Sequence, residues 1–238
     1  MSRRRFFVDR IERDRAALTG PDAHHLARVL RAEPGQRYEI TDGASLCLAE
    51  IESADPRQVQ FRVIELLDPG PPLPPIVVLA ALIKFDRFEW MIEKVTELGV
   101  KAVVPVETAR SETGLLRAAV KRVERWRKIA RESSQQSRRV QIPEIREAVS
   151  LGAALREPYG MKIALDENAA GASLLQRAQA WDRQTEIAIC IGPEGGWTDS
   201  ERTAMRDSGW LPASLGPTIV RAETAGIAAA AILLQLTV

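Results

Sequence analysis

The chain of 238 residues has little of the chemistry that builds metal centres and disulfides. Its two cysteines, Cys47 and Cys190, lie far apart and form no metal-binding or disulfide pattern. Cys190 stands inside an apolar run, so we expect it in the core. The two histidines, His24 and His25, are adjacent, so a zinc site would lack ligands. We therefore expect no metal.

Long hydrophobic runs and common nucleotide-binding motifs are also absent. The basic start at residues 1–5 is followed by a short apolar stretch at 6–8, too short for the apolar part of a secretory signal. The apolar run at 225–234 is about half of the roughly 20 residues that a membrane span needs. Neither a G-x-G-x-x-G motif after a strand nor a Walker A motif occurs. We expect a cytoplasmic protein with no membrane segment and no Rossmann or P-loop nucleotide site.

The net charge of +1 does not indicate a nucleic-acid-binding protein, but the charge is unevenly distributed. Residues 117–139 contain nine lysines and arginines and two glutamates. Four of the basic residues recur at helical spacing and would share one helix face: Arg117, Lys121, Arg125 and Lys128. The segment is either a solvated helix face or a helix that follows RNA phosphates.

A proline-rich segment at 68–75 divides the chain into residues 1–70 and 71–238. The first part has short alternating segments that predict strands at 37–41, 46–51 and 59–66, and a helix at 21–30. This mix predicts a small β-barrel. The second part alternates predicted strands (76–83, 102–106, 162–165, 186–191) with predicted helices (87–98, 116–134 and the C-terminal segment). Such alternation predicts an α/β domain with a parallel sheet covered on both faces.

A glycine-rich loop, Ile191-Gly-Pro-Glu-Gly-Gly-Trp197, is the most informative feature of the second part. An apolar strand at 187–191 precedes it, and residues 198–201 predict the cap and first turn of a helix. The loop thus follows the C-terminal end of a strand, where open α/β sheets bind ligands. Glu194 would repel a phosphate, so a ligand with cationic character, such as a sulfonium, fits better. The alternative is a tight strand–helix turn that binds nothing.

A second loop lies at 215–225 and contains the charged pair Arg221 and Glu223. We expect Thr224 to cap the helix that follows. This helix is apolar all round, which predicts burial in the core or in an interface.

Together the two loops resemble the SPOUT methyltransferases, and more narrowly the bacterial 16S rRNA uridine-N3 methyltransferases. The resemblance rests on GPEGG at 192–196 followed by LGxxIxRxETA at 215–225. Further similar segments lie at 5–8, 24–31, 84–87, 94–100 and 132–139, so the resemblance covers nearly the whole chain.

The resemblance implies a SPOUT domain at 71–238 whose last strands and helix form a trefoil knot, and a PUA-like RNA-binding barrel at 1–70. It also implies transfer of a methyl group from S-adenosylmethionine to N3 of a uridine in 16S rRNA, within the small ribosomal subunit, by a homodimer. Two alternatives stay open. One is a non-catalytic rRNA-binding or ribosome-assembly factor, and the other is a SPOUT methyltransferase acting on another RNA such as tRNA.

Uridine N3 is a poor nucleophile while it is protonated, so the site needs a base or a cation that stabilises the anion on O2 or O4. We expect Arg138 and Arg221 as candidate cations and Glu223 as the base or orienting carboxylate. Arg221 and Glu223 could instead form a structural ion pair, and Arg138 could contact only a phosphate.

Contacts to the cofactor are expected mainly from the backbone, because glycine lets the main chain approach a ligand closely. The expected cofactor-binding residues are Leu165, Gly192, Pro193, Glu194, Gly195, Gly196, Leu215, Gly216, Ile219, Arg221, Thr224 and Ala225. The expected RNA contacts are an arm formed by Arg3, Arg4 and Arg5, a helix face formed by His25, Arg28 and Arg31, and Lys84, Arg122, Arg125, Lys128, Gln135 and Arg138. Either histidine could equally be an ordinary surface residue.

Overall fold

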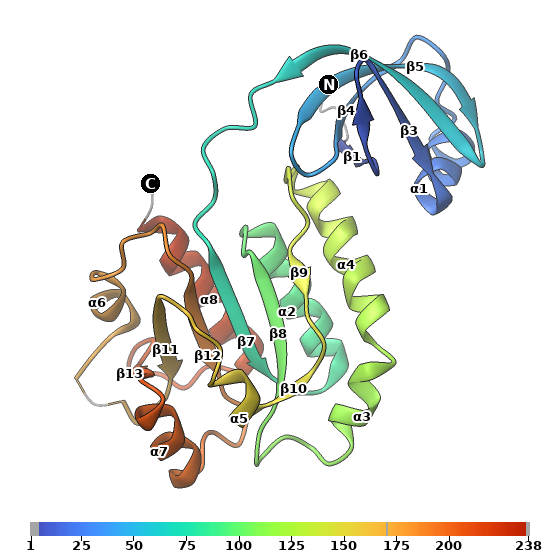
Figure 1. Ribbon diagram of the computed structural model, residues 1–238. Coiled ribbons are helices and arrows are strands. Elements are labelled where there is room, and N and C mark those ends of the chain that lie inside the picture. The colour runs from blue at the N-terminus through green and yellow to red at the C-terminus, as the bar shows by residue number, and fades with distance from the viewer. Residues whose placement is uncertain (1–4, 170, 237–238) are drawn as a thin grey trace. The chain divides into compact units, whose positions relative to one another are not determined.

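The computed structural model describes residues 5–169 and 171–236, and the chain divides into two compact units (Figure 1). The N-terminal unit comprises Met1–Pro72 together with Ser134–Ile142, and the C-terminal unit comprises Leu73–Ser133 together with Pro143–Val238. A short segment from the middle of the sequence therefore belongs to the N-terminal unit.

The N-terminal unit is built on a six-stranded sheet in the order β1-β4-β5-β6-β3-β2. Its strands are β1 (Arg5–Phe7), β2 (Ile11–Glu12), β3 (Arg15–Thr19), β4 (Arg37–Thr41), β5 (Leu46–Asp55) and β6 (Gln58–Leu67). β1 pairs with β4 in parallel and the other pairings are antiparallel. The three strands expected from the sequence are confirmed as β4, β5 and β6. The strand order of the described residues is open rather than closed, so the expected barrel is not seen.

The helix expected at 21–30 is present but changes type halfway. α1 (Gly20–His24) continues into a π-helical turn, η1 (His25–Val29), in which Leu30 N–H donates to the His25 carbonyl at 3.0 Å. Ala23 and Leu26 anchor this segment in a core that includes Phe6, Ile40 and Phe61.

The C-terminal unit has a parallel sheet in the order β10-β8-β7-β12-β11-β13, with the short β9 also pairing with β8. Its strands are β7 (Ile76–Ala81), β8 (Ala102–Glu107), β9 (Glu144–Ile145), β10 (Val149–Ser150), β11 (Met161–Leu165), β12 (Ile187–Ile191) and β13 (Leu211–Ala213). Its helices are α2 (Phe85–Glu97), α3 (Leu115–Val120), α4 (Val123–Gln136), α5 (Leu151–Ala154), α6 (Leu174–Ala178), α7 (Asp199–Asp207) and α8 (Ala222–Gln235), of which α4 ends in the Ser134–Ile142 segment. The expected mixed α/β fold with a parallel sheet is confirmed.

The centre of this sheet is buried, as the apolar runs predict. Every residue of β7 and β12 is buried, and α8 packs on both strands and on α2. Cys190 lies in β12 as a core residue, and burial, with the charge of Glu201, raises the pKa of its thiol. Within the described ranges, no helix combines the length and hydropathy that a membrane crossing requires.

Two helix boundaries differ from expectation. The single helix expected at 116–134 is broken, because hydrogen bonds from Lys121 and Arg122 tighten to i→i+3 spacing between α3 and α4. α8 begins at Ala222 with Arg221 as its N-cap residue, so Thr224 lies inside the first turn and is not the cap.

Candidate functional site

A cavity in the C-terminal unit lies where three parallel strands end. Its lining comes from the segments that follow β11, β12 and β13 and from the start of α8: Leu165, Asp166, Glu167, Ile191, Gly192, Pro193, Glu194, Gly195, Gly196, Trp197, Ala213, Ser214, Leu215, Gly216, Thr218, Ile219, Val220, Ala222 and Ala225. Carboxyl ends of parallel strands are the usual ligand position in open α/β sheets.

Neighbouring side chains pack closely against the glycines after β12. A Cβ atom on Gly192 would lie 3.1 Å from the Trp197 ring, and one on Gly195 would lie 3.2 Å from the Arg110 side chain. Gly196 has φ +68°, and its Cβ would lie 2.6 Å from a Glu167 carboxylate oxygen. Gly196 N–H closes the turn by donating to the Pro193 carbonyl at 2.8 Å. No larger residue fits at Gly196 without strain.

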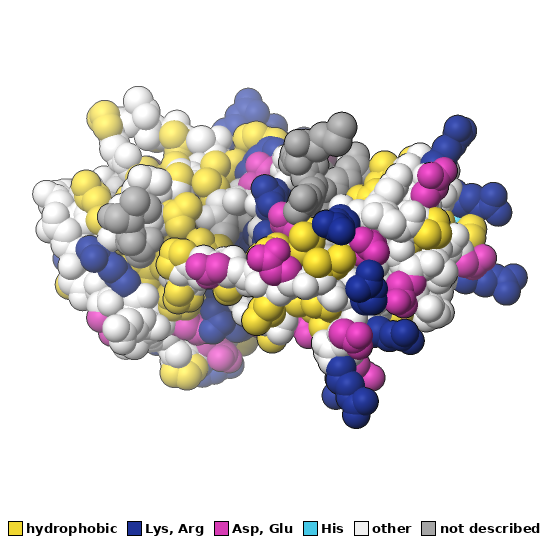
Figure 2. Space-filling model, turned by 90° about the horizontal axis from the view of Figure 1, so that it is seen from above, with side chains coloured by type: hydrophobic (Ala, Val, Ile, Leu, Met, Phe, Trp, Pro, Cys, Tyr) yellow, Lys and Arg dark blue, Asp and Glu magenta, His cyan; other side chains and the backbone are white. Residues whose placement is uncertain are grey.

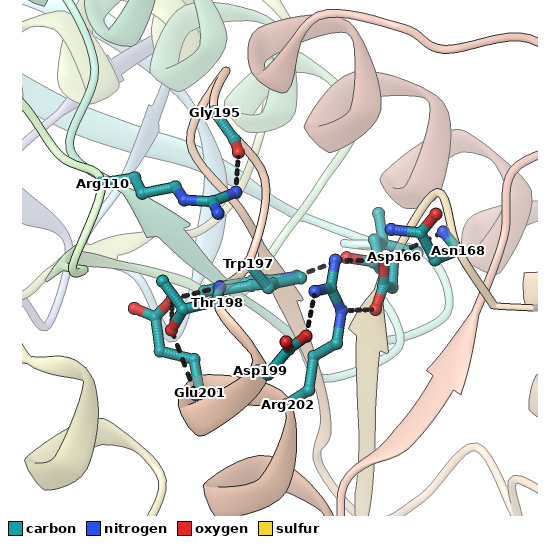
Figure 3. Close-up of polar contacts among 10 residues, drawn as sticks. Arg110, Asp166, Asn168, Gly195, Trp197, Thr198, Asp199, Glu201 and Arg202 are labelled. Atoms are coloured by element: carbon teal, nitrogen blue, oxygen red, sulfur yellow. Dashed lines mark hydrogen bonds and ion pairs between the residues drawn. The ribbon is translucent and has the colours of Figure 1, made fainter.

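A buried carboxylate anchors the end of this loop. Glu201 accepts hydrogen bonds from the backbone N–H and hydroxyl of Thr198, at 2.8 and 2.9 Å. Its other oxygen accepts from the Ala109 N–H at 2.8 Å, and the neighbouring Arg110 donates to the Gly195 carbonyl (Figure 3). The expected helix cap at residues 198–201 is confirmed as a capping box, which also ties α7 to the segment after β8.

An ion pair holds Asp166, which lines the cavity, against α7. Arg202 donates to both oxygens of Asp166, at 2.7 and 3.3 Å, and the Asn168 N–H donates to Asp166 at 3.0 Å. Burial alone would raise the pKa of Asp166, but these hydrogen bonds and the Arg202 charge lower it below its usual value. Figure 3 shows the Trp197 ring between this pair and the Thr198–Glu201 pair; its Nε1 donates to the Leu165 carbonyl at 2.7 Å.

Glu223 is the buried carboxylate at the start of α8. Its side chain is 6% exposed, and its Oε2 atom has no hydrogen-bond partner among the described residues. Oε1 lies 3.9 Å from Nε of Arg87, whose Nη1 donates to Glu194 at 2.9 Å. Arg221 is exposed, and within the described chain it forms no ion pair with Glu223. The partner of Glu223 is Arg87 rather than Arg221, which the sequence had suggested.

Ten of the twelve expected cofactor-binding residues line the cavity; Arg221 and Thr224 do not. Sequence reasoning missed Asp166, Glu167 and Trp197, although the first two directly follow the expected strand end at Leu165. It also missed Arg87, because the residues around Arg87 do not indicate that its partners are Glu194 and Glu223, far along the chain.

The arm expected at the N-terminus is wrong for Arg5, and Arg3 and Arg4 lie outside the described residues. Arg5 is a buried residue of β1 that donates twice to Glu39, at 2.8 and 3.2 Å. A buried, paired guanidinium is a structural group, because its charge is already compensated within the fold.

The helix face expected from His25, Arg28 and Arg31 is also wrong. The π-helical turn changes the angular spacing of His25 and Arg28, and Arg31 lies beyond the helix at φ +50°. Arg28 and Arg31 are nevertheless both exposed. Their contact with RNA stays a prediction.

Arg138 belongs to the N-terminal unit, at φ +57°. Its guanidinium, 48% exposed, bonds Glu39, and its carbonyl accepts from Arg5. Gln135 donates to Asp22 at 3.0 Å in the same unit. Burial lowers the pKa of the neighbouring Arg139 to about 10. Arg138 thus has a structural partner within the N-terminal unit.

The basic residues of α4 and the preceding turn are largely paired with carboxylates. Arg122 and Arg125 share Glu89, at 3.3 and 2.7 Å, and Lys128 lies 3.8 Å from Glu132. Lys84, the N-cap residue of α2, is exposed. On the face that Figure 2 shows, basic and acidic side chains are interspersed rather than gathered into one patch. No metal-binding group of three or more His, Cys, Asp or Glu occurs in the part of the chain that the structure describes.

Two family models match the chain. A family model described as an RNA methyltransferase domain matches residues 71–234, and one described as an RNA methyltransferase PUA domain matches residues 18–64. The chain is 33% identical to ribosomal RNA small subunit methyltransferase E of Mycobacterium bovis, covering 90% of this chain and 84% of that protein. The protein of the same name from Bacillus subtilis is 32% identical, over 88% and 85% of the two chains.

Two solved structures are similar over nearly their whole length. Ribosomal RNA small subunit methyltransferase E from Neisseria gonorrhoeae, bound to S-adenosylmethionine, is 25% identical with a TM-score of 0.86, and the match covers 98% of both chains. A methyltransferase from Legionella pneumophila in complex with the same cofactor is 30% identical with a TM-score of 0.85, over 99% and 98% of the chains.

Proposed function

Because the chain belongs to the family of RNA methyltransferases that includes ribosomal RNA small subunit methyltransferase E, we propose that it methylates N3 of a specific uridine in 16S rRNA with S-adenosylmethionine. The observation that carries this proposal is the cavity at the ends of β11, β12 and β13, together with the buried Glu223 beside it.

The cavity fits S-adenosylmethionine in its chemistry. Glycines at 192, 195 and 196 leave the backbone bare beside the cavity, and Glu194, which also pairs with Arg87, adds a carboxylate to the lining. The proposed cofactor contacts are Leu165, Gly192, Pro193, Glu194, Gly195, Gly196, Leu215, Gly216, Ile219 and Ala225. When bound, the cofactor supplies an electrophilic methyl group on its sulfonium.

In the proposed reaction Glu223 accepts the proton of uridine N3, so that the N3 lone pair can attack the methyl carbon while the bond from that carbon to sulfur breaks and S-adenosylhomocysteine leaves. This role is supported by the carboxylate's place at the start of α8, next to Ala222 in the cavity lining, and by Oε2, which no described residue hydrogen-bonds. Arg221, exposed at the N-cap of α8, and Arg138 are the proposed cations that stabilise negative charge on O2 or O4. The loops hold the reactants in line and exclude water.

We further propose that residues 1–70 act as a PUA-like RNA-binding domain and residues 71–238 as a SPOUT domain with a trefoil knot. The strand order supports a knot, because the chain reaches the sheet edge at β13 and then returns to pack α8 on β7 and α2. The proposed substrate is the small ribosomal subunit in the cytoplasm, and the proposed active form is a homodimer.

Mass spectrometry of nucleosides from 16S rRNA tests this function. We expect 3-methyluridine to disappear in a deletion strain and to return when the wild-type chain is expressed, but not when Glu223→Ala is expressed. Unchanged 3-methyluridine in the deletion strain would contradict the proposal. Loss of a methylated ribose from tRNA instead would identify another acceptor.

A further inference from the structure

Three elements of the C-terminal unit meet at one guanidinium. Arg87, in the first turn of α2, donates to Glu194 of the glycine loop at 2.9 Å and lies 3.9 Å from Glu223 in the first turn of α8. The two helices approach closely here, since a Cβ on Gly226 would lie 2.7 Å from Sδ of Met91. Arg87 therefore links the loop that lines the cavity to the carboxylate that adjoins it.

We propose that Arg87 is a positioning residue for methyl transfer, which fixes the Glu194 loop and holds the Glu223 carboxylate as a charged proton acceptor. This inference rests on the proposed function. Nothing in it requires Arg87 to touch the cofactor or the RNA.

The burial of Glu223 makes a nearby cation necessary. A carboxylate that is 6% exposed is poorly hydrated, and its charge is unfavourable without compensation. Among the described residues, the ion-pair partner of Glu223 is Arg87, which lies beside the Oε1 atom of Glu223. Oε2 is itself buried and has no hydrogen-bond partner within that part of the chain. Arg87 thus compensates the charge from the side of Oε1 and leaves Oε2 without a bond.

The chemistry of arginine explains how one side chain can serve two carboxylates. Its planar guanidinium presents several N–H donors in a fixed fork, so one nitrogen can bond Glu194 while another faces Glu223. A lysine at 87 would keep the charge but, as a point cation, would not hold both carboxylates in the same geometry.

The first experiment separates binding from chemistry. Calorimetry measures S-adenosylmethionine affinity, and single-turnover methyl transfer is measured at saturating cofactor, on small ribosomal subunits from the deletion strain. Arg87→Gln is compared with Lys94→Gln, a matched control that removes one positive charge from the same helix at the same 32% side-chain exposure. We expect Arg87→Gln to slow methyl transfer by about tenfold to a hundredfold, the scale of a misplaced catalytic group. Lys94→Gln should leave the rate unchanged.

Double-mutant cycles then test the two links. If Arg87 acts through Glu194, the loss of cofactor affinity in Arg87→Gln/Glu194→Gln should be smaller than the product of the two single losses. The same should hold for the transfer rate in Arg87→Gln/Glu223→Gln. Arg87→Lys should recover cofactor affinity more than transfer rate, which a general loss of folding would not produce.

The outcomes are distinguishable. Wild-type protein that transfers no methyl group would overturn the proposed function. Wild-type transfer with an equal rate in Arg87→Gln, or losses that multiply in both cycles, would overturn the role of Arg87 alone. A raised KM for the ribosomal subunit with an unchanged saturating rate would also overturn it, and would identify Arg87 as an RNA contact.

Discussion

At the scale of single residues, Gly196 is the position where the cavity tolerates least change. A side chain there would combine left-handed strain at φ +68° with a contact of 2.6 Å to Glu167. We expect Gly196→Val to abolish measurable S-adenosylmethionine binding in calorimetry, because a branched side chain at φ +68° strains the loop that lines the cavity and displaces the Glu167 carboxylate beside it.

A matched control separates strain from steric obstruction. Gly209 has a similar φ of +79°, but its Cβ would meet nothing within 4 Å. Gly209→Val should lower the melting temperature through backbone strain alone and keep the wild-type affinity. Equal affinity in all three folded proteins would remove Gly196 from the cofactor site.

The Asp166–Arg202 pair gives a pH-dependent prediction. The pKa of Asp166 is lower in the folded protein than its usual 3.8, so the pair contributes stability above that value and loses it as pH falls through the folded pKa. We expect Arg202→Met to lower the free energy of unfolding by roughly 1.5–3 kcal/mol at pH 7, the usual range for charge-assisted hydrogen bonds.

Urea titration checks this prediction at several pH values. The difference between wild type and Arg202→Met should shrink as pH falls from 7 to below the lowered pKa of Asp166. Arg206→Met, an exposed arginine one turn later in α7, should cause little change at any pH. A difference that stays constant down to acidic pH would mean that Asp166 is not the group responsible.

At the scale of elements, the sequence predicted the strands and helix ends that depend on neighbouring residues alone. The apolar run at 187–191 became β12 with the same bounds, and residues 198–201 became the capping box of α7. The start of α8 was wrong because Thr224 is a good cap in isolation, whereas the N-cap is Arg221, three residues earlier. Arg5 was misplaced because its buried pairing with Glu39 depends on a strand contact that the sequence does not show.

The same distinction applies to the candidate site. Glycine-rich loops are visible in the sequence itself, so most of the cavity lining could be predicted from it. The charge pairs around the cavity could not, because Asp166 and Arg202, or Arg87 and Glu223, come from distant parts of the chain. Their juxtaposition depends on the parallel sheet and on the packing of α2 against α8.

The segment formed by α4 and the turn before it carries the prediction for RNA affinity. Removing a cation that binds one phosphate should reduce the slope of log affinity against log salt by about 0.7–0.9. We expect Arg122→Gln/Arg125→Gln/Lys128→Gln to weaken binding of 16S rRNA and flatten this slope, with cofactor affinity unchanged. Since Glu89 neutralises part of this charge, Glu89→Gln should act in the opposite direction and strengthen binding.

Single-charge variants provide the control for this titration. Arg125→Gln should flatten the slope, whereas Lys101→Gln, another exposed and paired cation, should not. An identical slope for wild type and the triple variant would show that the segment is merely solvated.

At the scale of the whole molecule, the chain leaves apolar surface that a second copy could cover. Ile219 is 84% exposed in the loop beside the cavity, and Val220 is partly exposed. Along α8, Ile227, Ala228, Ala231 and Ile232 are only partly buried. Apolar surface of this kind favours an interface, and two-fold homodimers are the commonest assembly.

Complementation between two inactive variants tests whether the proposed homodimer shares its active sites. Gly196→Val disables the proposed cofactor loop, and Arg138→Ala removes a cation of the N-terminal unit. If each site takes its cofactor loop from one chain and Arg138 from the other, a mixed dimer contains one site with both lesions and one with none. Methyl transfer should then return to a fraction of the wild-type rate on mixing, while either variant alone stays inactive at the same total concentration. Sedimentation must show that mixed dimers form. Mixed dimers without activity would place Arg138 in the same chain's site, and a fully active monomer would exclude a shared site altogether.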